Sequence, residues 1–185
     1  AVELYRRAAE RGDATGQCNL GHMYESGRGV AKDWVQAAKW YGAAAEQGLA
    51  RAQLNLGVCC EFGRGVKKDP VRAAKLYRSA ADQGDRTAQC NLGYLYETGE
   101  GVEQNWQEAV KWYTRSAEQG SPRAQYHLAW CYEHASGVQQ DLAKALSLYE
   151  AAAAQQYEDA EKQVQRLRKP PEKGKFLRGL FGRHG

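Results

Sequence analysis

The sequence YESGRGV at residues 24–30 places two glycines one residue apart. The motif returns as GRGV at Gly63–Val66, as GEGV at Gly99–Val102 and as ASGV at Ala135–Val138, and each copy lies 36 residues after the one before. A glycine-rich loop that binds phosphate follows a strand and opens a helix whose N-terminus faces the anion. No strand pattern precedes these copies, so the motif predicts a recurring bend in a repeat protein rather than a nucleotide site.

The residues between the bends have the spacing of helices. Recurring residues within a unit are three, four or seven apart, and each unit has room for two helices. Residues that favour helix N-termini occupy one shared place in every unit: Asp33, Asp69, Asn105 and Asp141. Glycines that favour helix C-termini occupy another: Gly12, Gly48, Gly84 and Gly120. The sequence therefore predicts an all-α fold of antiparallel helix pairs.

The fourth bend differs from the other three because Ala135 replaces the glycine that ends the preceding helix. A left-handed backbone conformation costs an L-residue roughly 1 kcal/mol more than it costs glycine. We therefore expect the bend to be reshaped at Ala135.

The complete pattern, AQxNLGxxYExGxGVxxD followed by AxxxYxxAAxQG, resembles the Sel1-like repeat, a relative of the tetratricopeptide repeat. The resemblance implies a right-handed α-solenoid with 36-residue repeats over residues 1–168. This part would hold four full helix pairs, a leading helix and a polar-faced capping helix at 157–168. Residues 169–185 would form a separate, basic tail that contains Phe and Leu.

The same resemblance implies a scaffold or adaptor rather than an enzyme. Its partner would be a protein or peptide bound on the concave wall, which the first helix of each unit lines. On that wall we expect variable residues opposite the core-facing side, including Cys18 and Cys90, and a glutamate one turn further on: Glu25, Glu61, Glu97 and Glu133. The predicted partner-binding residues are Asn55, Val58, Asn91, Tyr94, Tyr126, His127, Trp130 and His134. Large aromatic residues place the expected centre of the groove in the third and fourth units.

A ligand-binding, metal-binding or hydrolytic Sel1-type protein is the first alternative. His127, Cys131 and His134 share one helix face, but zinc needs a fourth ligand, and the other units carry non-ligands at one or more of these positions. The cysteine-rich branch of Sel1-type proteins, to which β-lactam binding or hydrolysis is ascribed, has a cysteine in each helix of a pair. This chain has alanines at the second-helix positions, such as Ala44 and Ala45. No metal, cofactor or catalytic residue is therefore predicted.

Charge and cysteine content narrow the remaining classes. Residues 1–168 hold 21 basic and 21 acidic side chains, which argues against a nucleic-acid partner. Five cysteines form a poor disulfide framework and favour a reducing, cytoplasmic compartment, although the compartment stays open because the N-terminus looks incomplete. The tail KPPEKGKFLRGLFGRHG combines basic residues with Phe and Leu on one side. This suggests docking back on the solenoid, binding to another protein or to the groove of a neighbouring copy, or weak contact with an anionic membrane. A membrane-associated scaffold is therefore the second alternative.

Overall fold

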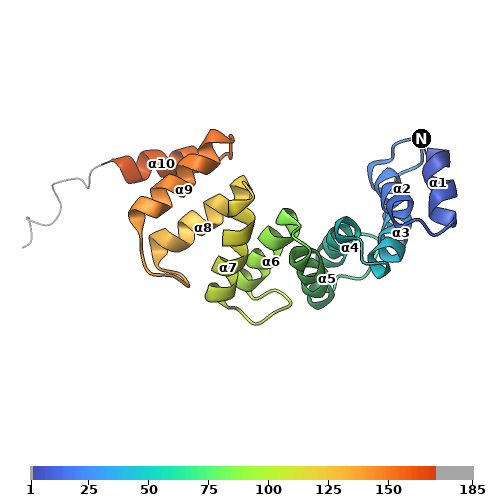
Figure 1. The fold of residues 1–185 in the computed structure, drawn as a ribbon, viewed down its shortest axis with the longest axis horizontal. Coiled ribbons are helices and arrows are strands. Elements are labelled where there is room, and N and C mark those ends of the chain that lie inside the picture. The colour runs from blue at the N-terminus through green and yellow to red at the C-terminus, as the bar shows by residue number, and fades with distance from the viewer. Residues whose placement is uncertain (1, 170–185) are drawn as a thin grey trace, which may run out of the picture.

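The computed structural model describes residues 2–169, and within this range the chain forms ten helices and no strand (Figure 1). The helices are α1 (Val2–Glu10), α2 (Ala14–Ser26), α3 (Trp34–Glu46), α4 (Ala50–Phe62), α5 (Pro70–Asp82), α6 (Arg86–Thr98), α7 (Trp106–Glu118), α8 (Pro122–His134), α9 (Leu142–Ala154) and α10 (Ala160–Arg168). None of these helices is both long and apolar enough to cross a membrane. The tail at 170–185, with its predicted self-association or membrane contact, lies outside the described residues.

Each helix packs mainly on the helix before it and the helix after it. Figure 1 shows the result as an open arc, with α1 and α10 at its two ends. The predicted all-α solenoid of antiparallel helix pairs is confirmed.

The helix ends follow the capping residues that recur in the sequence. After each bend, an aspartate or asparagine side chain accepts a hydrogen bond from a backbone N–H in the first turn of the next helix; Asp69, for example, accepts from Arg72 N at 2.9 Å. Gly27, Gly63 and Gly99 end α2, α4 and α6 with φ values of 71°, 69° and 78°. These left-handed residues turn the chain, and they confirm that the repeated motif is a bend between helices.

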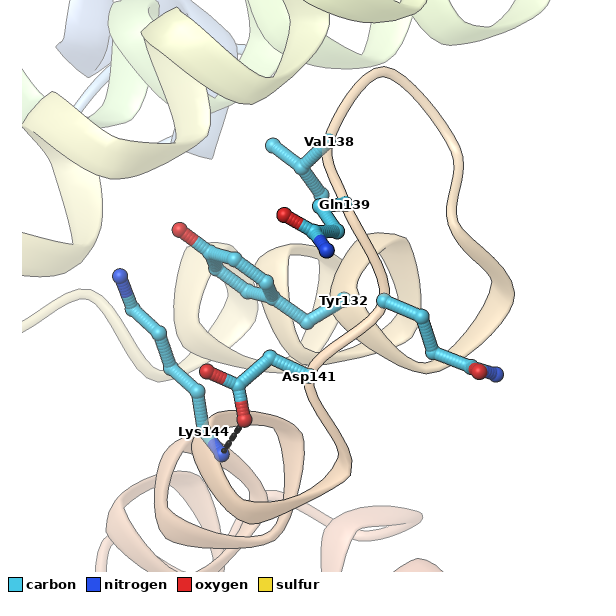
Figure 2. Close-up of a pocket in the computed structure, with 6 residues that line it drawn as sticks. Tyr132, Val138, Gln139, Asp141 and Lys144 are labelled. Atoms are coloured by element: carbon cyan, nitrogen blue, oxygen red, sulfur yellow. Dashed lines mark hydrogen bonds between the residues drawn. The ribbon is translucent and has the colours of Figure 1, made fainter.

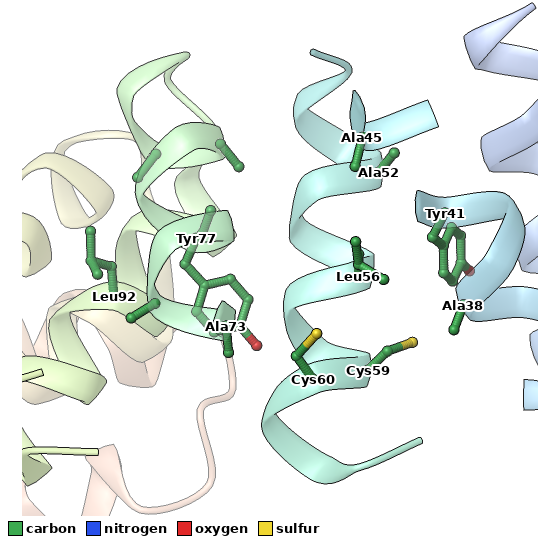
Figure 3. Close-up of a cluster of buried hydrophobic side chains, with 14 of the residues drawn as sticks. Ala38, Tyr41, Ala45, Ala52, Leu56, Cys59, Cys60, Ala73, Tyr77 and Leu92 are labelled. Carbon is green, nitrogen blue, oxygen red and sulfur yellow. The ribbon is translucent and has the colours of Figure 1, made fainter. Parts of the chain in front are cut away.

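The core is built mainly from alanines, leucines and cysteines, with one buried tyrosine per unit (Figure 3). Tyr41, Tyr77 and Tyr113 are fully buried, and each ring lies on a glycine of the preceding helix. At Gly57, a Cβ atom would lie 2.6 Å from the Tyr77 ring, so no larger residue fits without a shift of the helices. The Tyr–Gly contact therefore sets how closely the two helices around each bend approach.

The bend at Ala135 is not reshaped, so that expectation was wrong. Ala135 takes the left-handed conformation itself, with φ 57°, and its N–H bonds to the Cys131 carbonyl just as Gly27 N–H bonds to Met23. Downstream, Asp141 N donates to the Tyr132 carbonyl as in the other units. The surrounding hydrogen bonds hold the bend in the shape of the other units, and Ala135 therefore adopts a strained, left-handed backbone conformation.

Replacing Ala135 by glycine should raise the free energy of unfolding by about 0.5–1 kcal/mol, because glycine adopts positive φ without strain. Ala135 is exposed, so the lost methyl group removes little packing. The measurement is urea unfolding followed by circular dichroism. Gly99→Ala is the matched control and should destabilise by a similar amount; an Ala135→Gly protein less stable than the parent would contradict the strain.

Candidate functional site

The candidate site is the wall formed by the even-numbered helices α2, α4, α6 and α8, where side chains of successive units meet. Arg51 Nη2 donates to Asn19 Oδ1 at 2.5 Å, and two units further on Arg123 Nη1 donates to Asn91 Oδ1 at 3.0 Å. These bonds link α4 to α2 and α8 to α6. Side chains of neighbouring units are therefore linked at two of the three seams of the wall.

Beneath the wall, the recurring glutamates bond to the buried tyrosines. Tyr77 Oη donates to Glu61 Oε2 at 2.5 Å, and Tyr113 Oη donates to Glu97 Oε2 at 2.5 Å. The same bond joins Tyr41 to Glu25 and Tyr149 to Glu133. Burial, together with the neighbouring glutamate, raises the pKa of these tyrosines, so each phenol stays protonated and acts as the donor.

Two expectations about the wall are corrected by these contacts. The glutamates are not exposed groups for a partner: Glu61 and Glu133 are each only 8% exposed, and all four bond to a core tyrosine. Cys18 and Cys90 are not on the surface either, since they are 1% and 2% exposed. The tyrosine of the next helix covers each glutamate, and Asn55 of α4 reaches Cys18 of α2, with its Nδ2 4.0 Å from the sulfur. A wheel drawn for one isolated helix includes neither kind of contact.

His127 lies at the centre of an aromatic cluster in the third and fourth units. Its ring stacks on Tyr113 with centroids 5.0 Å apart and meets Tyr94 and Tyr126 edge-on at 6.1 Å and 5.9 Å. His127 Nδ1 also lies 3.2 Å from Glu97 Oε2. Tyr157, from the turn before α10, packs on Tyr126 at 5.1 Å. The partly buried rings of this cluster therefore hold one another in fixed orientations.

Glu97 is the charged group below this cluster. Burial by itself would raise the pKa of Glu97, but hydrogen bonds from His127 and Tyr113 and the nearby positive charge of Arg123 outweigh it, so the pKa lies below its ordinary value. Glu97 is thus ionised at neutral pH and fixes the positions of the His127 and Tyr113 rings.

Trp130 and His134 form a second group beside the cluster. Trp130 stacks on Trp106, at the start of α7, with centroids 5.4 Å apart, and on His134 at 4.3 Å. His134 is exposed, and its Nδ1 lies 3.0 Å from the Trp130 carbonyl oxygen. Both predicted residues therefore lie on the same stack, with its His134 end open to solvent.

The remaining predicted residues, Asn55 and Val58, lie in the second unit. Asn55 helps to line a hollow of about 280 Å³, whose other walls are Cys18, Asn19, His22 and Arg51. The hollow is thus lined by residues of the first and second units, apart from the expected centre of the groove. The sequence reasoning also missed Arg51 and Arg123; both occupy one position of the repeat where other units have threonine, and that change was a usable signal.

The three proposed metal ligands do not come together. Cys131 is fully buried in the core, where burial and then the charge of Glu97 raise the pKa of its thiol to about 12. His127 instead pairs with Glu97, and His134 stacks on Trp130. Among residues 2–169, no group of three or more His, Cys, Asp or Glu side chains has the arrangement of a metal site.

A second hollow, of about 530 Å³, lies at the fourth bend and is wide open to solvent (Figure 2). Tyr132, Val138, Gln139, Gln140, Asp141 and Lys144 line it. Asp141 accepts the Lys144 backbone N–H as the helix cap, and the Lys144 ammonium group lies 4.4 Å from the Tyr132 ring centre. Asp141 and Lys144 of this hollow are thus engaged in the helix cap and the cation–π contact. They do not form a catalytic arrangement.

Comparisons with known proteins agree with this fold. The family model of the Sel1 repeat matches residues 1–13, 14–49, 50–85, 87–121 and 122–157. A Sel1 repeat protein from Oxalobacter formigenes is 39% identical, with a TM-score of 0.84, over 91% of this chain and 67% of that protein. The c5321 protein, a protective antigen of uropathogenic Escherichia coli with this fold, is 37% identical, with a TM-score of 0.85, over 90% of this chain.

The chain spans only 36% of the length of c5321. The immunity protein Pa5087 from Pseudomonas aeruginosa is a more distant relative, 27% identical with a TM-score of 0.55, and the match covers 86% of this chain and 59% of that protein. Among curated protein sequences, none matches the chain.

Tyr113→Phe should lower the free energy of unfolding by about 1–3 kcal/mol, because the partly buried Glu97 carboxylate loses a hydrogen-bond donor. Tyr94→Phe is the matched control. The Tyr94 hydroxyl makes no hydrogen bond within the described residues, so its loss should change stability by less than about 0.5 kcal/mol. Equal effects of the two substitutions in urea unfolding would show that the Tyr113–Glu97 bond contributes nothing.

Glu97 should also make stability depend on pH. Because its pKa is lower in the folded state, ionised Glu97 stabilises the protein above the pKa of the unfolded chain, and this contribution is lost as the pH falls through the folded value. The difference in unfolding free energy between the parent and Glu97→Gln should therefore shrink as the pH falls below about 4.5. A difference that stays constant from pH 7 to pH 3 would contradict this.

Proposed function

The chain belongs to the Sel1 repeat family, whose members commonly act as scaffolds for protein–protein interactions, and we propose that this protein binds a peptide or protein segment along the α2–α4–α6–α8 wall. The aromatic cluster on α6 and α8 is the observation that carries the proposal. The chemistry of the wall indicates a class of ligand, namely a segment with apolar or aromatic side chains.

The aromatic side chains of Tyr126 and Trp130 are not needed for the repeat itself. At the position of Tyr126 the other units have Cys18, Leu54 and Cys90, and at the position of Trp130 they have His22, Val58 and Tyr94. The smaller residues build the same helices, so the large partly exposed rings add a surface rather than a core. Fixed aromatic groups of this kind are the residues that contribute most to protein interfaces.

The polar end of the wall complements the aromatic end. Arg51 is exposed at the rim of the hollow beside Asn55, and its bond to Asn19 orients the guanidinium group. A guanidinium group and an amide can bind carboxylate or backbone carbonyl oxygens. The bound segment would thus place an apolar or aromatic side chain on Tyr94 and Tyr126 and an acceptor group over Arg51 and Asn55.

Catalysis is the weaker alternative. The family is a scaffold family and is generally not enzymatic. The thiols of this chain are also poor nucleophiles: burial raises the pKa of Cys59 and of Cys90 to about 11, so both are protonated at neutral pH. A nucleophilic mechanism would need a thiolate with an adjacent base.

The double substitution Tyr126→Ala/Trp130→Ala should weaken partner binding at least about tenfold, since loss of two aromatic anchors removes 1.4 kcal/mol or more. The partner is first captured with the parent protein from native lysate and identified. Its affinity for each purified variant is then measured by calorimetric titration. Far-UV circular dichroism checks that the helices are intact.

Trp40→Ala is the matched control, because Trp40 is a partly exposed tryptophan on α3, outside the wall. It should leave the affinity unchanged. Arg51→Gln tests the polar end and should weaken binding without changing stability. If binding survives the double substitution, the wall does not hold the partner.

A further inference from the structure

Charge is distributed unevenly along the described part of the chain, although residues 1–168 are neutral as a whole. Residues 28–78 hold ten basic and four acidic side chains, whereas residues 79–161 hold five basic and thirteen acidic ones. The first half of the arc is therefore basic and the second half acidic. The capping aspartates and the glutamates bonded to tyrosine are part of both counts, so the difference comes from the other charged residues.

The contrast is sharpest at two neighbouring bends. The second bend carries Arg64, Lys67 and Lys68, and the third carries Glu100 and Glu103. All five side chains are exposed, and none takes part in an ion pair within the described residues. Opposite charges thus lie on adjacent repeats without pairing to each other.

The bends form one edge of the solenoid because each one packs on the start of the odd-numbered helix of the unit before it. A Cβ atom at Gly65 would lie 1.9 Å from the Trp34 carbonyl oxygen, and one at Gly101 would lie 2.2 Å from the Pro70 carbonyl oxygen. Glycine is required for this contact. The basic and acidic bends are therefore neighbours in a row, which we name the bend edge.

Apolar side chains are exposed at the basic part of the bend edge. Val35, Phe62 and Val71 are 62%, 58% and 51% exposed, and they are among the most exposed large apolar residues of the described chain. The Arg64 guanidinium group lies 5.1 Å from the ring centres of both Trp34 and Phe62. Unpaired charges around an exposed apolar patch are the composition of an interface with a polar rim.

A groove of about 450 Å³ opens beside this patch, between α3 and α5, and Gly42 lies in its wall. The other glycines inside the described helices are crowded: a Cβ atom at any of them would come within 3 Å of another residue. A Cβ atom at Gly42 would meet nothing within 4 Å. Glycine within a helix costs about 1 kcal/mol relative to alanine, and no packing contact among residues 2–169 requires it at residue 42.

The equivalents of Gly42 in later units are Arg78, Thr114 and Glu150. The corresponding groove, between α5 and the third bend, is only about 160 Å³, and Arg78 lines it. Glycine at residue 42 therefore keeps the first groove open. An open apolar groove next to a basic loop is suited to apolar side chains from an acidic surface.

We propose that the bend edge binds a second copy of the chain, antiparallel, so that the basic bend of each copy faces the acidic bend of the other. A twofold axis between the second and third bends brings both opposite-charge contacts together at once, as an isologous dimer requires. The exposed apolar patch and the Gly42 groove form the apolar part of the same interface. The pairing leaves the α2–α4–α6–α8 wall free. The dimer proposal is therefore independent of the proposed function, and failure of one does not affect the other.

Exchange of charge between the two bends tests the pairing. Lys67→Glu/Lys68→Glu and Glu100→Lys/Glu103→Lys should each abolish dimerisation, because each sets like charges against each other. An equimolar mixture of the two variants should dimerise again, since both contacts then join opposite charges. Sedimentation equilibrium measures the dimer fraction, and the parent dimer should weaken at least about tenfold between 50 and 500 mM NaCl.

Asp82→Lys/Glu118→Lys is the matched control, because it changes net charge as Glu100→Lys/Glu103→Lys does but at exposed residues in the last turns of α5 and α7. It should dimerise like the parent. Gly42→Arg, which copies the next unit, should stabilise the monomer against urea and weaken the dimer at least about tenfold; unchanged dimerisation would overturn the place of the groove in the interface.

Three results would overturn the pairing. The parent could stay monomeric up to 500 µM at low salt, or the mixed variants could remain monomeric. A parent that stays monomeric but binds phosphatidylserine vesicles, and loses that binding in Lys67→Glu/Lys68→Glu, would assign the basic edge to an anionic membrane instead.

Discussion

The hydrogen bond from a buried tyrosine to a glutamate sixteen residues earlier is the contact on which the rest of this structure depends. It joins the end of one helix to the middle of the next across the bend, as between Tyr77 and Glu61. The Tyr77 ring lies directly on a glycine, Gly57, where a Cβ atom would come within 2.6 Å of it. An isolated glutamate at 8% exposure would be costly, and the phenol donor removes that cost. The spacing of the two helices, the bend between them and the burial of the glutamate thus depend on one another in each unit.

The fourth unit shows how this requirement relaxes toward the end of the solenoid. Ala129 replaces the glycine under the tyrosine ring, and the Tyr149–Glu133 bond is 3.1 Å, longer than the 2.5 Å of the preceding unit. Glu133 gains a second partner, Arg166 of α10, which the earlier units do not have at that position. Two non-glycine residues with positive φ, Ala135 and Gln156, also belong to this unit. The Arg166–Glu133 ion pair of the last helix thus compensates for the longer Tyr149–Glu133 hydrogen bond.

Much of the fold could be predicted from the sequence because its determinants are local and recur. The N-caps, the glycines of the bends and the helical spacing each follow from the properties of one or a few neighbouring residues, and Asp69 and Gly63 do in the structure what their types predict. The errors concern contacts beyond a single helix. Cys90 and Glu61 look exposed on a single helix, but neighbouring helices cover them. Ala135 was misjudged because the surrounding bonds outweigh its local preference.

The same division explains why surfaces, and not the core, carry the individual character of this chain. Tyrosine, glutamate, alanine and the bend glycines are committed to the repeat, and a change at any of them strains the helix spacing. Three places are free of this demand: the wall positions of Tyr126 and Trp130, the rim position of Arg51 and Arg123, and the bend residues between the fixed glycines. The first two differ from unit to unit in size and charge, and the third changes sign between Lys67 and Glu103. The glycine at residue 42, which keeps a groove open, departs most clearly from the demands of the repeat, because it lowers helix stability and no contact among residues 2–169 requires it.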